Sequence, residues 1–268
     1  MAGFLIFRKG IYKVFNNLTV NYKTMKTTKL LSLALVIFLL NSCGPKNPKT
    51  RKVEFTSTTY TDLTTWNSSG KPDGMLKDTI PPDLLQFIDT LLPDGENLPK
   101  RHPELFSSSA IGDITITSPS TVYITFVKQS GGLNNALGFY TYPTGQSPTK
   151  PEDIQQITYV FPNAGSLSPL VAGDKMNIGN FTAGTSIGFV LMQNAWNPTT
   201  ATLNNDAIHY LTNDALNPEV DPNLRKHAVL IPYAPADKTL IGFEDYDRTS
   251  AGCDNDFNDV LFYVTVTH

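Results

Sequence analysis

The chain has 268 residues, with 19 prolines, 18 glycines and only 17% charged residues. This length is enough to bury a core, and so many turn-forming residues with so few charges favour short strands over long helices. The net charge of −3 offers no basic face to a nucleic acid, so nucleic-acid binding is excluded.

The N-terminal region resembles a signal for export. Lys26 and Lys29 precede an apolar run at residues 30–40, which is followed by Cys43. The run is shorter than the roughly 20 residues of a membrane span and fits the apolar region of a signal peptide, roughly 7–15 residues. Residues 40–43, Leu-Asn-Ser-Cys, resemble a bacterial lipobox, in which Cys43 is lipidated and becomes the mature N-terminus.

We therefore expect a signal region at residues 1–43 with its true start at Met25, because residues 1–24 resemble an over-called start or an unusually long leader. Residues 44–52 are polar and proline-rich, which predicts a tether. Several acyl chains would hold the protein firmly on a membrane. The expected location is the bacterial cell envelope, as an outer-membrane lipoprotein. A periplasmic and a surface-facing orientation both remain open.

Residues 53–110 predict an N-terminal extension with one short helix. The helix is expected over residues 82–92, with a proline at its start and Pro93-Asp94-Gly95 at its end. One face of this helix is apolar, formed by Leu84, Phe87, Ile88 and Leu91. We expect that face to pack on the domain.

Strand patterns separated by turn residues recur through residues 111–268. This spacing predicts an antiparallel β-sandwich, similar to a jelly roll, in an all-β protein. The expected strands cover residues 113–117, 121–128, 137–142, 157–161, 175–178, 186–193, 207–211, 227–233, 238–244 and 259–266.

The sequence contains two features that are associated with catalytic or metal sites in other proteins. Residues 184–188 match the Gly-x-Ser-x-Gly nucleophile motif around Ser186, but the residues that follow continue a strand instead of beginning a helix. The four histidines lack the spacing of metal ligands, so they are expected in the core or facing solvent. No catalytic residue is assigned, and we do not expect an enzyme.

The most acidic stretch of the chain runs from Glu244 to Asp259. It holds six carboxylates and one arginine, a charge of about −5. Carboxylates a few ångströms apart repel by roughly 1 kcal/mol or more per pair even with the screening of water. Apolar runs with strand spacing, at residues 240–243 and 260–266, lie on either side. We therefore expect two paired strands joined by an acidic loop that requires a counter-charge.

Calcium is the expected counter-ion of this loop. Asp254, Asp256 and Asn258 occupy alternate positions and supply hard oxygen ligands, of which Ca²⁺ takes about 6 to 8 at roughly 2.3 to 2.6 Å. The pattern is not an EF-hand, because a strand follows it in place of a helix. Mg²⁺ would require stricter octahedral geometry, and a solvated acidic loop without a metal is the alternative. The six candidate ligands are Glu244, Asp245, Asp254, Asp256, Asn258 and Asp259.

Cys253 is the cysteine that remains once Cys43 is lipidated, so the mature chain forms no internal disulfide. The neighbouring Asp254 is expected to raise the pKa of the Cys253 thiol and to disfavour a nucleophilic thiolate. We expect a small, buried packing residue.

Three blocks of sequence resemble a known family. Residues 241–245, Ile-Gly-Phe-Glu-Asp, together with residues 253–260, Cys-Asp-Asn-Asp-Phe-Asn-Asp-Val, resemble the signature of the bacterial DUF4114 domain family. Residues 135–140 and 187–194 are similar to further blocks of that family, which also occur in LruC-like bacterial lipoproteins. The resemblance covers roughly residues 111–268. It implies an extracytoplasmic all-β domain with a calcium site and no established activity.

These observations lead to one main hypothesis and two alternatives. The main hypothesis is a lipid-anchored cell-envelope protein whose calcium-binding β-sandwich serves binding or adhesion, with a glycan or a protein as ligand. The first alternative is a hydrolase that acts on glycans through a carboxylate pair such as Glu244 with Asp245 or Asp256. The second is a purely structural envelope subunit.

Overall fold

The computed structural model describes residues 49–268. The expected signal region, Met25, Cys43 and residues 44–48 of the expected tether lie outside the described residues.

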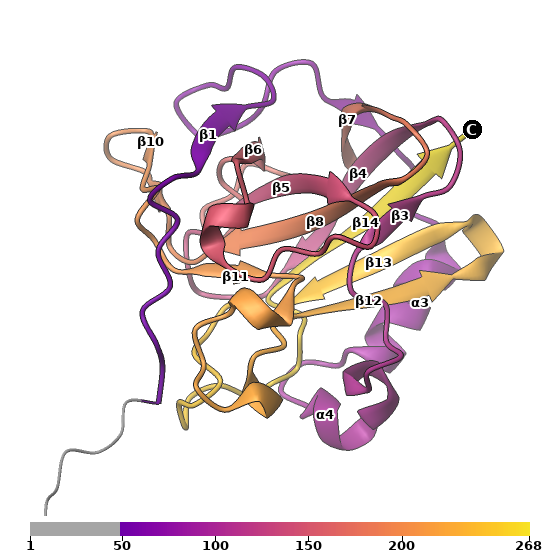
Figure 1. Ribbon diagram of the computed structural model, residues 1–268. Coiled ribbons are helices and arrows are strands. Elements are labelled where there is room, and N and C mark those ends of the chain that lie inside the picture. Colours follow the sequence, from indigo (N-terminus) through magenta and orange to yellow (C-terminus); the bar gives the residue numbers. More distant parts are fainter. Residues whose placement is uncertain (1–48) are drawn as a thin grey trace, which may run out of the picture. The chain divides into compact units, whose positions relative to one another are not determined.

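Two β-sheets form the body of the domain (Figure 1). The first sheet contains, in spatial order, β1 (Thr59–Asp62), β6 (Gln156–Phe161), β5 (Ala136–Pro143), β8 (Thr185–Met192) and β11 (His209–Leu211), with β3 (Ile114–Ile116) also paired to β8. The second sheet contains β12 (Ala228–Tyr233), β13 (Lys238–Phe243), β14 (Val260–Thr267), β4 (Ser120–Gln129), β7 (Asp174–Phe181) and β2 (Leu76–Lys77). A separate ribbon pairs β9 (Trp196–Asn197) with β10 (Thr202–Leu203).

The main core lies between the two sheets. Strand residues alternate between faces, so each sheet contributes one row of apolar side chains to this core. Phe161 of β6 stacks on Phe262 of β14 with ring centroids 5.8 Å apart, and Phe189 of β8 and Ile241 of β13 are fully buried in the same cluster. The predicted all-β sandwich with mainly antiparallel pairing is confirmed.

A helix covers the outer face of the second sheet. α3 (Pro82–Leu91) begins with a proline in its first turn and ends before Pro93. Its residues Leu84 and Ile88 pack against Leu240 of β13 and Tyr263 of β14, in a second apolar cluster (Figure 1). The helix therefore buries the second face of β13 and β14, which explains why consecutive residues are apolar at Leu240-Ile241 of β13 and at residues 260–264 of β14.

The remaining helices are short. They are α4 (Leu98–Arg101) and the 3₁₀ turns η1 (Pro103–Phe106), η2 (Pro151–Asp153), η3 (Asp214–Leu216), η4 (Pro222–Leu224) and η5 (Ala234–Ala236).

The residues expected as an N-terminal extension contribute to both sheets. β1 pairs in parallel with β6, and β2 pairs with β7. Upstream of both strands, Thr50 forms an isolated antiparallel bridge with Glu219. The sequence pattern did not predict β1, β2, β9 or β10, which have only two to four residues each.

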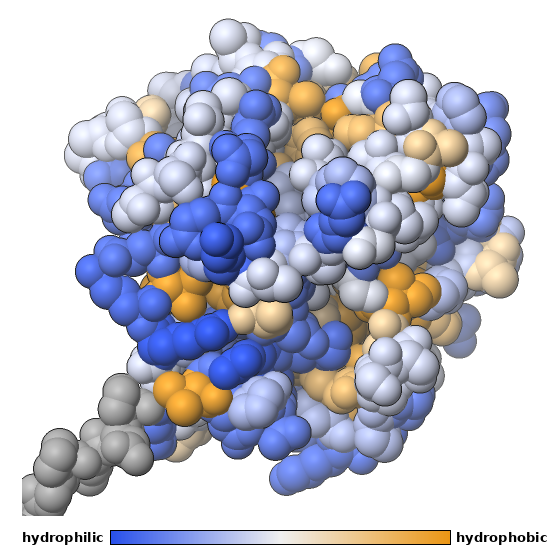
Figure 2. All heavy atoms as spheres, viewed as in Figure 1, coloured by the Kyte–Doolittle hydropathy of each residue, from blue (hydrophilic) through white to orange (hydrophobic). Residues whose placement is uncertain are grey.

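Each strand predicted after residue 111 is present, with shifted ends. β11 begins at His209 instead of residue 207, and β7 extends to Phe181 instead of residue 178. Within residues 49–268, no helix combines the length and apolarity needed to cross a membrane. Figure 2 shows that the apolar atoms on one face form small separate areas among polar ones.

Candidate metal centre

The acidic stretch is the connection between two neighbouring antiparallel strands, as predicted. β13 ends at Phe243, which is in register with Val260, the first residue of β14. The backbone therefore returns to the same end of the second sheet, and residues 244–259 form a long loop there. This register places Glu244 and Asp245 next to the C-terminal end of the loop.

Three of the six candidate ligands converge. Glu244, Asp254 and Asp256 each present a carboxylate oxygen within 4.8 Å of the oxygens of the other two. Two oxygens on opposite sides of a Ca²⁺ ion are separated by twice the metal–oxygen distance, about 4.6 to 5.2 Å. Glu244 and Asp256 are only 1% and 2% exposed, whereas Asp254 faces solvent. The cluster thus has two buried ligands and one exposed ligand.

The backbone of the loop is unusual where these ligands occur. Asn255 and Phe257 both have left-handed backbone angles, with φ of 62° and 59°. A bulky residue such as Phe257 pays a steric cost in this region, and such strain gathers at binding sites. The Phe257 ring is fully buried and packs edge-on against Phe106, with centroids 5.1 Å apart. This packing holds the turn that presents Asp254 and Asp256.

Arg248, the one basic residue of the loop, orders the backbone. Its Nε donates to Asn255 Oδ1 at 2.7 Å and its Nη1 donates to the Lys226 carbonyl at 2.8 Å. The guanidinium also lies 5.1 Å from the centre of the Phe257 ring. Among residues 49–268, no ion pair joins any carboxylate of the acidic loop to a basic side chain. Apart from Arg248, which makes no ion pair, the described residues place no basic side chain on the carboxylates of the loop.

The segment between α3 and α4 braces the loop from outside. Gly95 N donates to Asp256 Oδ2 at 2.8 Å, and Leu98 N donates to the Asn255 carbonyl at 2.9 Å. Sequence reasoning missed these contacts, because the first joins residues 161 positions apart. The turn residues Pro93-Asp94-Gly95 predicted only the end of the helix.

Asp245 and Asp259 form a separate carboxyl pair. Asp245 follows Glu244 directly in the chain but does not belong to the cluster of three carboxylates. Asp245 N donates to Asp259 Oδ2 at 2.8 Å, and Asn135 Nδ2 donates to Asp245 Oδ2 at 2.6 Å. Burial, followed by the charge of Asp245, raises the pKa of Asp259 to about 9. This shift favours the neutral form of Asp259, which closes the base of the loop through the Asp245 N–H.

Asn258, the sixth candidate, holds the loop to its neighbours. Its amide Nδ2 donates to the Leu92 carbonyl at 3.2 Å, its backbone N–H donates to Asp256 Oδ1 at 3.1 Å, and its Oδ1 accepts from the Ser130 hydroxyl. The structure thus divides the six residues into a cluster of three, a pair and a single bridging amide.

Glu244 has the clearest sign of a missing partner. Its Oε2 is buried and has no hydrogen-bond partner, although buried polar atoms nearly always have one. Burial first, and then the charges of Asp254 and Asp256, raise the pKa of Glu244 to about 7. An ionised Glu244 is therefore unfavourable without a cation, and a cation in the cluster would satisfy this oxygen.

Cys253 lies next to the cluster and is half-buried, whereas a small, buried packing residue was predicted. Its thiol lies close enough to the Glu244 side chain for the two groups to influence each other's pKa. Burial is the largest cause of a strong upward shift of its pKa, and the Glu244 charge comes next. The thiol therefore stays protonated near neutral pH.

Residues 181–267 match the model of the DUF4114 family, described as a domain of unknown function. The chain carries a DUF4114 domain. No curated protein matches the chain, and no solved structure matches it either.

The matched part of the DUF4114 domain includes the whole acidic loop and the strands on both sides of it. It begins at Phe181, the last residue of β7. β4 precedes the matched residues in sequence, although it lies between β14 and β7 in the second sheet. The resemblance identified in the sequence extends further upstream than this match.

Ser186 and the histidines lie outside the acidic cluster. Ser186 lies within β8 and hydrogen-bonds the Thr144 hydroxyl at 2.9 Å, so the strand continues through it as predicted. His209 is buried beside a cavity of about 530 Å³, where its Nε2 accepts from the Tyr60 hydroxyl at 2.8 Å. Burial lowers the pKa of His209 to about 4. None of the six candidate ligands lines this cavity.

Proposed function

We propose that this chain is a calcium-binding β-sandwich, held at the bacterial cell envelope by a lipid on Cys43, and that it acts there as a binding module. The observation that carries the calcium proposal is the buried Oε2 of Glu244, which has no hydrogen-bond partner and lies in a cluster with Asp254 and Asp256.

The chemistry of the cluster favours calcium over other ions. All three ligands are carboxylates, which are hard oxygen donors, and Cys253 keeps its proton. Ca²⁺ accepts irregular sets of oxygens, whereas Mg²⁺ demands near-octahedral geometry and keeps several waters. A deeply buried glutamate on a strained loop, with one exposed aspartate at its rim, suits the more tolerant ion.

Metal binding fits this site better than glycan hydrolysis. A glycosidase needs two carboxyl groups on either side of a bound sugar. Glu244 and Asp256 are 1% and 2% exposed, and the Gly95 amide already covers Asp256. A sugar ring therefore has no access to both groups.

Calorimetric titration of the purified full chain with CaCl₂ tests the calcium site. The expected result is saturable uptake and a higher melting temperature with calcium than with EDTA, because a ligand that binds only the folded state stabilises it. Asp256→Ala should abolish both effects. Glu152→Gln, which removes an exposed carboxylate far along the chain, is the matched control and should keep them. Folded wild-type protein that takes up no calcium at millimolar concentration would contradict the proposal.

The envelope anchor is tested separately with Cys43→Ser. Cells expressing the wild-type chain should incorporate labelled fatty acid into the protein and keep it in the membrane fraction. The variant should do neither. A labelled Cys43→Ser protein would refute lipidation at this residue without affecting the calcium proposal. Glycan arrays and pull-downs, each with calcium and with EDTA, then test for a ligand, and their failure would favour a purely structural subunit.

A further inference from the structure

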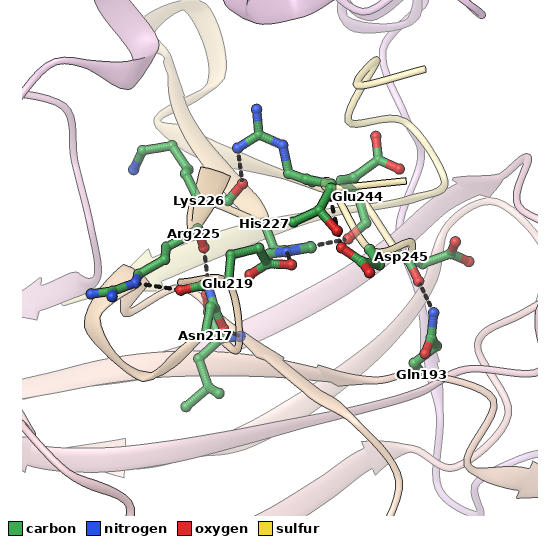
Figure 3. A network of polar contacts seen from close by, with 12 residues as sticks. Gln193, Asn217, Glu219, Arg225, Lys226, His227, Glu244 and Asp245 are labelled. Atoms are coloured by element: carbon green, nitrogen blue, oxygen red, sulfur yellow. Dashed lines mark hydrogen bonds and ion pairs between the residues drawn. The ribbon is translucent and has the colours of Figure 1, made fainter. Parts of the chain in front are cut away.

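A buried histidine lies directly behind the acidic cluster. His227 precedes β12 and is fully buried between Glu219 and the main chain of Glu244 (Figure 3). Its Nδ1 is 2.9 Å from the Glu244 carbonyl oxygen, and its Nε2 is 2.9 Å from Glu219 Oε1. Tyr210 stacks on the imidazole, with ring centroids 3.7 Å apart and an angle of 10° between the planes. The ring is thus held on both edges and on one face.

The partners of the ring determine where one proton lies. A main-chain carbonyl can only accept a hydrogen bond, so Nδ1 of His227 carries a proton and donates it to Glu244. On the other edge, Nε2 and Glu219 share a second proton. The pair is neutral overall whichever of the two groups holds that proton, which makes its burial tolerable.

Two hydrogen bonds join His227 to the main chain of Glu244. Glu244 N donates to the His227 carbonyl at 2.9 Å, and the Glu244 carbonyl accepts from Nδ1 of the same residue. The second bond fixes the peptide plane between residues 244 and 245, and the N–H of that peptide donates to Asp259. β13 ends at Phe243, so Glu244 lies just beyond the strand and depends on these bonds for its orientation.

A contribution to the stability of the fold does not explain why the His227–Glu219 pair is buried. Glu219 is fully buried, yet its Oε2 has no hydrogen-bond partner, and a buried ion pair seldom stabilises a fold more than apolar residues would. Fixing the groups around a bound metal ion is a known use of such outer partners, whose loss typically weakens metal binding 10- to 100-fold.

We propose that His227 is a positioning residue of the cation site, oriented by Glu219: its Nδ1–H holds the Glu244 carbonyl and so directs the free carboxylate oxygen of Glu244 toward the cation. This inference rests on the proposed calcium site. It assigns to His227 a role in the affinity for calcium, separate from any role of this residue in folding.

Substitution of His227 by asparagine or by glutamine tests the two edges of the imidazole separately. An asparagine amide nitrogen lies as many bonds from the backbone as Nδ1, so His227→Asn can keep the donor to the Glu244 carbonyl. A glutamine amide reaches the position of Nε2 and loses that donor. Both substitutions remove the ring that stacks on Tyr210, which makes them a matched pair.

Both substitutions are made in the Glu219→Gln background, because removing the histidine alone would leave a buried carboxylate without a partner. The full chain of each double variant is titrated with CaCl₂ by calorimetry, and near-ultraviolet circular dichroism checks its folding. We expect the His227→Asn double variant to bind calcium at least tenfold more tightly than the His227→Gln double variant.

Equal affinities of the two folded double variants would overturn the positioning role while leaving the calcium site intact. Absence of calcium uptake by the wild-type chain would instead refute the calcium site, and the positioning role with it. If the double variants do not fold, nitrogen NMR of the wild-type imidazole tests the positioning role instead. Calcium should shift the His227 Nδ1 resonance, and an unchanged resonance under saturating calcium would overturn the proposal.

Discussion

Glu244→Gln is the most informative substitution in the candidate metal centre, because it should stabilise the metal-free protein while abolishing its response to calcium. Burial and the nearby carboxylates raise the pKa of Glu244 from 4.5 to about 7. With about 1.4 kcal/mol for each tenfold change in an ionisation constant, keeping Glu244 ionised in the folded protein at pH 8 costs about 3 kcal/mol. The amide is neutral, and its N–H groups can donate to Asp254 or Asp256.

The size of the effect is measurable as a change of melting temperature. One kcal/mol corresponds to roughly 2 to 4 °C for a domain of this size, so metal-free Glu244→Gln should melt about 6 to 12 °C above the metal-free wild type at pH 8. Calcium at 100 times its dissociation constant should stabilise the wild type by about 2.7 kcal/mol, or roughly 5 to 11 °C. The metal-free variant should therefore melt close to the calcium-loaded wild type.

The assay is thermal unfolding followed by circular dichroism, with EDTA and with calcium, for the wild type, Glu244→Gln and the surface control Glu152→Gln. The control should behave as the wild type does in both conditions. Two results would refute the reasoning. One is a metal-free Glu244→Gln protein that melts below the wild type, which would mean that the ionised carboxylate is not strained. The other is a calcium response that survives the substitution.

Three further predictions concern pH and the scaffold of the loop. Because the folded pKa of Glu244 lies above its unfolded value, its contribution to metal-free stability is present below about pH 4.5 and is lost as the pH rises through about 7. Calcium affinity should instead rise with pH. It should be about tenfold lower at pH 6 than at pH 8, because protons compete with calcium for the Glu244 carboxylate. Calorimetry that gives the same affinity at several pH values would exclude Glu244 as a ligand. Gly242→Ala places a Cβ 2.4 Å from the Phe257 carbonyl oxygen, so it should lower the free energy of unfolding, measured with a denaturant, by about 1 to 3 kcal/mol. Gly252→Ala is the control: the atom nearest to its new Cβ is 3.7 Å away, so the free energy of unfolding should not change. Arg248→Lys keeps the charge but loses the two directed hydrogen bonds, so it should lower the free energy of unfolding by about 2 kcal/mol and weaken calcium binding. An unchanged calcium affinity would show that Arg248 does not order the ligands.

The sequence by itself determined the class of fold and the place of the acidic loop. Apolar residues with strand spacing at residues 121–128 and 238–244 predicted strands that the structure confirms as β4 and β13. Proline at the start and Pro93-Asp94-Gly95 at the end predicted the helix α3. These signals are local, because side-chain periodicity and turn chemistry act over a few residues. The pairing of the strands on either side of the loop followed from the same periodicity.

Only the tertiary structure decided which acidic residues meet. The even spacing of Asp254, Asp256 and Asn258 suggested one ligand set, but the side chain of Asn258 turns to Ser130 and Leu92, and Asp245 pairs with Asp259. The support of the cluster by Gly95 and by His227 was equally invisible, since each comes from a different part of the chain.

The physical reason is the difference between local and non-local interactions. Backbone sterics and side-chain alternation are written into neighbouring residues, so the sequence reveals strands, turns and a concentration of charge. The ionisation of Glu244 depends instead on its depth of burial and on carboxylates brought close by the folded loop. The sequence therefore determined that acidic groups gather between β13 and β14, and packing determined which of them lack a partner.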